Sequence, residues 1–140
     1  MNRQVLLAVI LGAVALLGLY YWLESRKISA PEGGGPEMVA VEVPQLSQAA
    51  AQGKLVFEQF CAACHGANAA GQEGVAPPLV HRIYESGHHA DVAFQIAAQN
   101  GVRAHHWPFG NMPPIEGITA EQVAQVVTYV RELQRANGIN

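Results

Sequence analysis

The chain has 140 residues, of which 50% are hydrophobic and 14% are charged, and its formal net charge at pH 7 is −3. A sequence of this length is typical of one domain of ordinary size. Acidic residues slightly outnumber basic ones, and the chain lacks the basic patch that nucleic-acid binding requires. We therefore expect no nucleic-acid partner.

The amino-terminal segment is a candidate membrane anchor. No charged residue lies between Val5 and Leu23, and at about 1.5 Å per residue this run reaches roughly 28 Å, close to the hydrocarbon thickness of a bilayer. Aromatic residues occupy positions 20–22, where amphipathic rings favour the membrane interface. A cleaved signal peptide is the alternative, but no small-residue cleavage pattern closes the run. We therefore predict that residues 1–23 form an uncleaved transmembrane signal anchor.

The segment after this run has the composition of a linker. Glycines at positions 33–35 and prolines at 31, 36 and 44 interrupt any regular structure. We predict a flexible Pro/Gly-rich linker over residues 24–46 and a globular domain over residues 47–140.

Helical patterns dominate the globular domain. The first predicted helix begins near Ser47, and its apolar residues fall on roughly one face: Leu55, Val56, Phe57 and Phe60. A shorter helix is predicted from Asp91 to a C-cap at Gly101. No convincing pair of alternating strands is present, so the predicted fold class is all-α with long loops.

The last predicted helix has the clearest signals. Thr119 and Gln122 fit a capping box, and Gly138 is a plausible stop. Between them, apolar residues follow helical spacing: Val123, Val126, Val127, Val130 and Leu133. Short helices joined by long loops have little to pack against, so we expect a further group at the centre of the domain.

Cys61 and Cys64 are the only cysteines of the chain, and His65 follows them directly. A redox dithiol would need a βαβ surround, a zinc site would need four well-placed ligands, and a disulfide across so short a loop would stabilise little. The remaining interpretation is covalent haem attachment. Thiols at positions i and i+3 lie close together on a helical turn and can reach two vinyl groups of one haem, and the next histidine can ligate the iron.

Further along the chain, four segments in this order resemble the class I c-type cytochromes: "GKLVFEQFCAACHG" with Gly53 and Phe57, "APPL" at residues 76–79, "NMPP" at residues 111–114 and "TYVRELQ" with Tyr129. The resemblance covers almost all of residues 47–140. It implies a cytochrome c fold of three to four helices around one haem c, bound covalently through Cys61 and Cys64. It also implies that the Pro77 carbonyl accepts the second ring proton of His65.

Met112 is the predicted sixth iron ligand. Met1 is terminal and Met38 lies in the predicted linker, so Met112 is the only credible thioether in the domain. A thioether favours Fe(II) and raises the reduction potential. Three alternatives stay open: a core methionine at position 112, a bis-histidine haem, and a copper or zinc site built from the two histidine pairs. The candidate second ligands of a bis-histidine haem are His81, His88, His89, His105 and His106, and the two pairs are residues 88–89 and 105–106.

The resemblance implies electron transfer rather than catalysis, with no small-molecule substrate. Haem attachment in this family occurs outside the cytoplasmic membrane, so the expected location is the inner membrane, single-pass, with the haem domain in the periplasm. The expected partners are membrane redox proteins that donate and accept electrons. The chain would either shuttle between them or form the electron-entry subunit of a larger redox enzyme. A peroxidase or gas sensor is a third possibility, for a haem that lacks Met112 as ligand.

Overall fold

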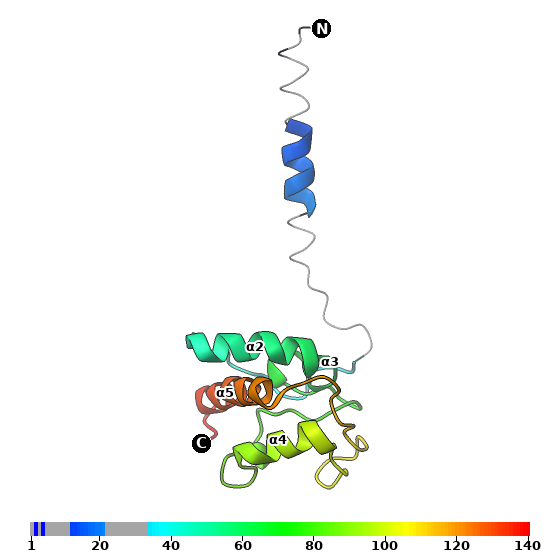
Figure 1. Ribbon diagram of the computed structural model, residues 1–140, viewed down its shortest axis with the longest axis vertical. Coiled ribbons are helices and arrows are strands. Elements are labelled where there is room, and N and C mark those ends of the chain that lie inside the picture. Colours follow the sequence, from blue (N-terminus) through cyan, green and yellow to red (C-terminus); the bar gives the residue numbers. More distant parts are fainter. Residues whose placement is uncertain (1, 3, 5–11, 22–33) are drawn as a thin grey trace. The chain divides into compact units, whose positions relative to one another are not determined.

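The computed structural model describes residues 2, 4, 12–21 and 34–140 (Figure 1). The chain divides into two compact units, Met1–Glu32 and Gly33–Asn140. In the first unit, residues 12–21 are helical. Of the helices in the described ranges, none is both long enough and apolar enough to cross a membrane. Residues 1, 3, 5–11 and 22–23 of the predicted anchor lie outside those ranges.

The second unit is mostly helical, in agreement with the predicted fold class. Its elements in chain order are α2 (Gln48–Phe60), α3 (Ala62–His65), η1 (Ala67–Ala69), η2 (Arg82–Tyr84), α4 (Asp91–Asn100) and α5 (Ala120–Ala136). Within residues 34–140 there is no β-strand, only isolated bridges that pair Glu37 with Gln72, Gln72 with Ala76, and Val102 with Met112. Long loops connect the helices, as the many glycines and prolines predict.

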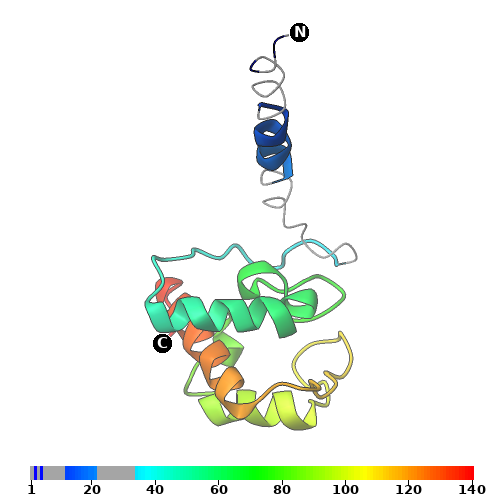
Figure 2. The ribbon, with the colours of Figure 1, turned by 45° about the horizontal axis from the view of Figure 1, so that its top comes forward.

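Helices α2 and α5 pack against each other and form the centre of the second unit (Figures 1 and 2). Gly53 lies at their contact, where a Cβ atom would stand 2.0 Å from the carbonyl oxygen of Gln125. One turn later, the rings of Phe57 and Tyr129 meet with their centroids 5.5 Å apart. Both rings are fully buried. The predicted apolar face of the first helix is wrong at Leu55, which is 59% exposed because it lies two residues from Phe57 and so on the opposite side of the helix.

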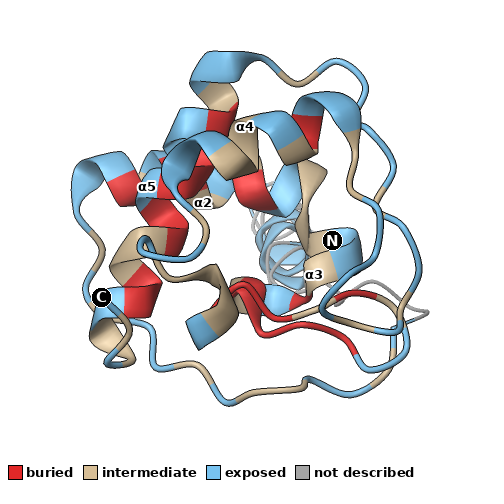
Figure 3. Ribbon diagram, turned by 90° about the horizontal axis from the view of Figure 1, so that it is seen from below, coloured by how far each residue is buried: buried red, intermediate tan, exposed pale blue. Residues whose placement is uncertain are grey.

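The last helix forms as predicted. The Thr119 side chain accepts a hydrogen bond from the Gln122 amide at 3.2 Å, and the Gln122 side chain accepts one from the Thr119 amide at 2.9 Å. This closes the capping box. The apolar residues at helical spacing are all buried, and Figure 3 shows the buried positions along one side of α5: Val123, Val126, Val127, Val130 and Leu133. The predicted start of α4 at Asp91 and its C-cap at Gly101 are also confirmed.

Residues 34–46, which belong to the predicted flexible linker, make several hydrogen bonds to the helical domain. The amides of Met38 and Val39 donate hydrogen bonds to the Ala70 carbonyl at 3.3 and 3.2 Å. Glu42 and Asn137 are joined twice, from the Glu42 amide to Asn137 Oδ1 at 2.9 Å and from Asn137 Nδ2 to the Glu42 carbonyl at 2.8 Å. The other part of the predicted linker, residues 24–33, lies outside the described ranges.

Arg131 holds the loop before α4 onto α5. Its side chain is only 11% exposed. The guanidinium donates to the carbonyl of Tyr84 at 2.6 Å, to the carbonyl of His89 at 2.5 Å and to the carboxylate of Asp91 at 2.9 Å. It also lies 5.1 Å from the centre of the Phe94 ring. One buried cation therefore fixes both ends of the segment that leads into α4.

Candidate functional site

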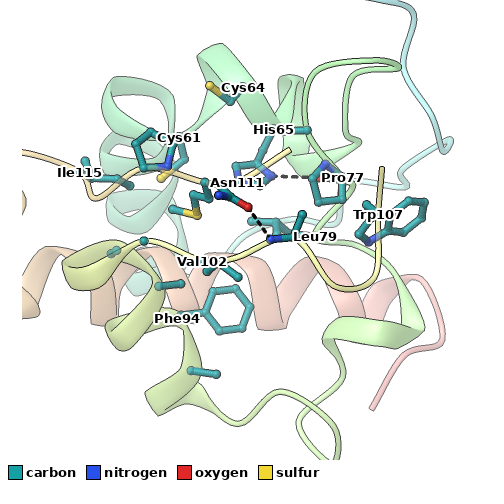
Figure 4. Close-up of a pocket in the computed structure, with 18 of the residues that line it drawn as sticks. Cys61, Cys64, His65, Pro77, Leu79, Phe94, Val102, Trp107, Asn111 and Ile115 are labelled. Atoms are coloured by element: carbon teal, nitrogen blue, oxygen red, sulfur yellow. Dashed lines mark hydrogen bonds between the residues drawn. The ribbon is translucent and has the colours of Figure 1, made fainter. Parts of the chain in front are cut away.

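A cavity of about 600 Å³ opens among α3, α4, α5 and the loops between them (Figure 4). This is within the size range of cofactor and ligand pockets. Most of its lining is apolar and includes Leu79, Phe94, Ile115 and Val126. The same cavity is lined by both cysteines, by His65 and by Met112, so it brings together the side chains that the sequence singled out for haem binding.

Cys61, Cys64 and His65 lie on a single helical turn. The amides of Cys64 and His65 both donate to the Cys61 carbonyl, at 3.1 and 2.9 Å. No disulfide joins the two cysteines. Burial, with the charge of Cys64 as the smaller cause, raises the pKa of the Cys61 thiol to about 11. Because only the thiolate is strongly nucleophilic, this folded arrangement does not itself favour reaction at Cys61.

His65 is oriented by the loop that crosses beside it. Its Nδ1 atom lies 2.8 Å from the Pro77 carbonyl oxygen (Figure 4). A carbonyl can only accept, so Nδ1 carries the proton and Nε2 keeps its lone pair. Burial lowers the pKa of His65, against the smaller opposite effect of the Pro77 hydrogen bond. The imidazole is therefore held neutral and in the tautomer that can bind a metal through Nε2.

The loop that carries Met112 is closed at its base by backbone hydrogen bonds. The Val102 amide donates to the Met112 carbonyl at 2.9 Å, and the Met112 amide donates to the Val102 carbonyl at 3.0 Å. The Asn111 side chain accepts from the Ala104 amide at 2.9 Å (Figure 4). Gly101 has φ +72°, and a Cβ there would lie 2.5 Å from the Met112 carbonyl oxygen, so this close approach requires glycine.

The residues around the cavity fit a haem. Its lining includes the imidazole of His65 and the thioether of Met112, and these are the two ligand types that hold iron in electron-transfer haems. The indole Nε1 of Trp107 is buried and has no hydrogen-bond partner among the described residues. Trp107 itself is packed between His81 and Phe109, with ring centroids 5.2 and 5.9 Å away. Buried donors are nearly always paired, and a carboxylate of a bound group would satisfy this one.

The two histidine pairs lie together at one edge of the site. His89, His105 and His106 line the cavity. His88 and His106 bring their Nε2 atoms to 3.4 Å of each other. His81 lies apart from this group, where its Nδ1 accepts a hydrogen bond from the Ile83 amide at 3.2 Å and caps η2.

Two residues that support the site have little signal in the sequence. Gln72 donates from Nε2 to the carbonyls of Ala62 and Ala63, at 3.2 Å each, and so holds the short helix α3 that ends at His65. Asn111 closes the Met112 loop through its side chain. An asparagine just before a proline-rich turn is a weak sign of such a bond, because asparagine side chains often hydrogen-bond nearby backbone. Gln72 carries no comparable local signal.

Comparison with known proteins agrees with this geometry. A family model described as cytochrome c matches residues 50–134, which is more than half of the chain. Neither a curated protein nor a solved structure matches the chain. The matched segment contains every residue that lines the cavity, from Cys61 to Val126. The chain therefore belongs to the cytochrome c family, whose members bind haem c covalently and transfer electrons.

Proposed function

We propose that this chain is a monohaem electron carrier in which His65 and Met112 would hold the haem iron. The observation that carries the proposal is that a neutral, Nδ1-protonated imidazole and a thioether line one apolar cavity beside the two attachment cysteines. Two strong-field ligands leave no open iron position for a substrate. This favours electron transfer over the alternatives of a peroxidase and a gas sensor.

Each protein group then has a defined task. When bound, the haem supplies one-electron redox chemistry. Pro77 fixes the ring of His65 and makes its Nε2 a better donor. The closed base of the Met112 loop holds the thioether in one place. The apolar lining excludes water and so limits the solvent rearrangement that accompanies a change of charge.

The histidine pairs are the competing ligands, and their exposure argues against that role. His88, His105 and His106 are exposed, whereas Met112 is half-buried. Their rings lie among the other histidines, with the centroids of His105 and His106 only 4.2 Å apart. Met112 has no comparable side-chain partner among the described residues and remains available to the cavity.

A methionine substitution tests the ligand set. We expect the oxidised wild-type holoprotein to show a far-red thioether-to-iron charge-transfer band, which Met112→Ala removes. Met38→Ala is the matched control, because Met38 lies outside the cavity lining, and it should keep the band. Absence of the band in the wild type, or its survival in Met112→Ala, would contradict His/Met ligation.

We further propose that the chain is anchored in the inner membrane by residues 1–23, with the haem domain in the periplasm. The support is the uncharged run from Val5 to Leu23 and the extracytoplasmic attachment of haem in this family. Alkaline washing of membranes from cells that express the full chain is the test. We expect the haem chain to stay in the pellet, and its release into the wash would disprove a spanning anchor.

The proposed partners are membrane redox proteins that donate and accept electrons, between which the tethered chain shuttles. A tether raises the effective concentration of the haem domain at the membrane surface. The second candidate, an electron-entry subunit of a larger enzyme, is distinguished by solubilisation in mild detergent. A single haem chain supports the shuttle, whereas a stable complex that co-purifies supports the subunit.

A further inference from the structure

A group of three histidines lies where two loops of the domain meet. His88 and His89 follow η2, and His106 belongs to the loop before Met112. One ligand atom from each lies within 4.8 Å of the other two. His88 and His106 are exposed, and His89 is half-buried. We propose that His88, His89 and His106 bind one divalent transition-metal ion of the class that prefers imidazole, such as Zn²⁺, in addition to the haem iron.

The spacing of the ring nitrogens fits such an ion. The Nε2 atoms of His88 and His106 are 3.4 Å apart. Two nitrogens bound to a tetrahedral zinc at the usual Zn–N length of about 2.0–2.1 Å lie about 3.3–3.4 Å apart. Two neutral imidazoles gain little from each other at this separation, because at most one hydrogen bond can join them. A shared cation would stabilise both nitrogens at this separation.

His89 is oriented as metal-binding histidines usually are. Its Nδ1 lies 2.5 Å from the Ile83 carbonyl, so Nδ1 carries the proton and Nε2 is free to bind. Its own backbone carbonyl accepts from Arg131 at 2.5 Å. The amides of His88 and His89 both donate to the Glu85 carbonyl, at 3.0 and 2.8 Å. The backbone of both ligands on this loop is therefore fixed before any ion arrives.

The backbone of the third histidine is also held in place. Its loop is closed by the Val102–Met112 backbone pair and by the Asn111 side chain. His105, although it is next to His106 in the chain, is not one of the proposed ligands, because it does not belong to the group whose ligand atoms lie within 4.8 Å of one another.

Three imidazoles with an exposed side leave the fourth position to water or to a partner's side chain. Neutral imidazole suits Zn²⁺, Cu²⁺ and Ni²⁺ rather than Mg²⁺ or Ca²⁺, which require oxygen ligands. The bound ion would join residues 88–89 to the loop that ends at Met112, and so would brace that loop from outside the cavity. The proposal does not depend on Met112 being an iron ligand.

Isothermal titration of Zn²⁺ into the full-length holoprotein, prepared without a polyhistidine tag, tests the site. Zn²⁺ is redox-inert, and in the holoprotein the cysteines are consumed as thioethers. We expect one saturable site per chain. His88→Gln and His106→Gln should each weaken binding at least about tenfold, since each removes one ligand. His105→Gln is the matched control, an exposed histidine on the same loop, and should bind within about threefold of the wild type.

Two outcomes would overturn the proposal. The first is no saturable 1:1 binding by the wild type. The second is a pattern among the variants that does not follow the assigned ligands, with His105→Gln as damaging as His106→Gln, or with His88→Gln indistinguishable from the wild type. An unchanged haem absorption spectrum in each variant separates the loss of a ligand from the loss of the fold. X-ray absorption at the zinc edge should show imidazole nitrogens and no sulfur in the coordination shell.

Discussion

Gly53→Ala should destabilise the domain strongly, because this glycine lies where α2 and α5 are closest. The new Cβ would stand 2.0 Å from the Gln125 carbonyl oxygen, 2.7 Å from its carbon and 3.0 Å from the Tyr129 Cβ. The two backbones must therefore separate. Overpacking of this kind costs about 3 kcal/mol at the upper end of its usual range. Alanine returns about 1 kcal/mol as the better helix former.

The net loss is about 2 kcal/mol, which lowers the melting temperature of a domain of this size by about 8–16 °C. This decrease is measured by thermal unfolding of the holoprotein, monitored by far-ultraviolet circular dichroism. Gly87→Ala is the control, because a Cβ at Gly87 meets nothing within 4 Å, and it should stay within about 0.5 kcal/mol of the wild type. Equal melting temperatures for the two variants would refute the argument from the helix contact.

Three other substitutions test separate features. A Cys61→Ala/Cys64→Ala chain without haem should lack the native helical circular dichroism, because the apolar walls of the cavity would have no haem to pack against. A native-like spectrum would count against this prediction. Burial, with the charge of Glu58 as the smaller cause, raises the pKa of Tyr129 to about 12. The unfolded chain therefore loses this proton first, and the stability of the fold should decrease between about pH 10 and pH 12. Tyr129→Phe should lack that fall in urea unfolding, and parallel curves would disprove the assignment. Arg131→Met should cost about 2–3 kcal/mol in the same assay, because the part-buried carbonyls of Tyr84 and His89 each lose a charged donor. Asp91→Ala should cost less than about 1 kcal/mol, because its carboxylate is 69% exposed. Similar costs for the two variants would contradict this.

The helices could be predicted where their signals are local. The capping box at Thr119, the valine spacing of α5 and the glycine after α4 all lie within the element that they define. Which face of α2 is buried could not be predicted in this way, because it depends on where α5 packs. Once Gly53 and Phe57 are known to face α5, the exposure of Leu55 follows, since it lies two residues from each of them. Periodicity describes one helix and contains no information about its neighbour.

In the site, too, local features could be predicted from the sequence and contacts between distant segments could not. The cysteine pair with His65 is contiguous in the sequence and its chemistry could be recognised directly. The meeting of His88 with His106 depends on two loops 18 residues apart, each fixed by its own backbone hydrogen bonds. Residues 34–46 are a similar case. Their prolines and glycines correctly predict the lack of regular structure, but composition does not reveal that the amides of Met38 and Val39 find an acceptor at Ala70.

The docking of residues 34–46 onto the helical domain limits how far that domain can travel from the amino-terminal helix. Only residues 22–33 separate residue 21 from residue 34. At no more than about 3.5 Å per residue, their contour length is roughly 40 Å, whatever conformation they adopt. With a membrane-embedded amino terminus, the haem would sample a thin layer of solution next to the bilayer. Its exchange partners would then have to expose their own redox centres close to the lipid surface.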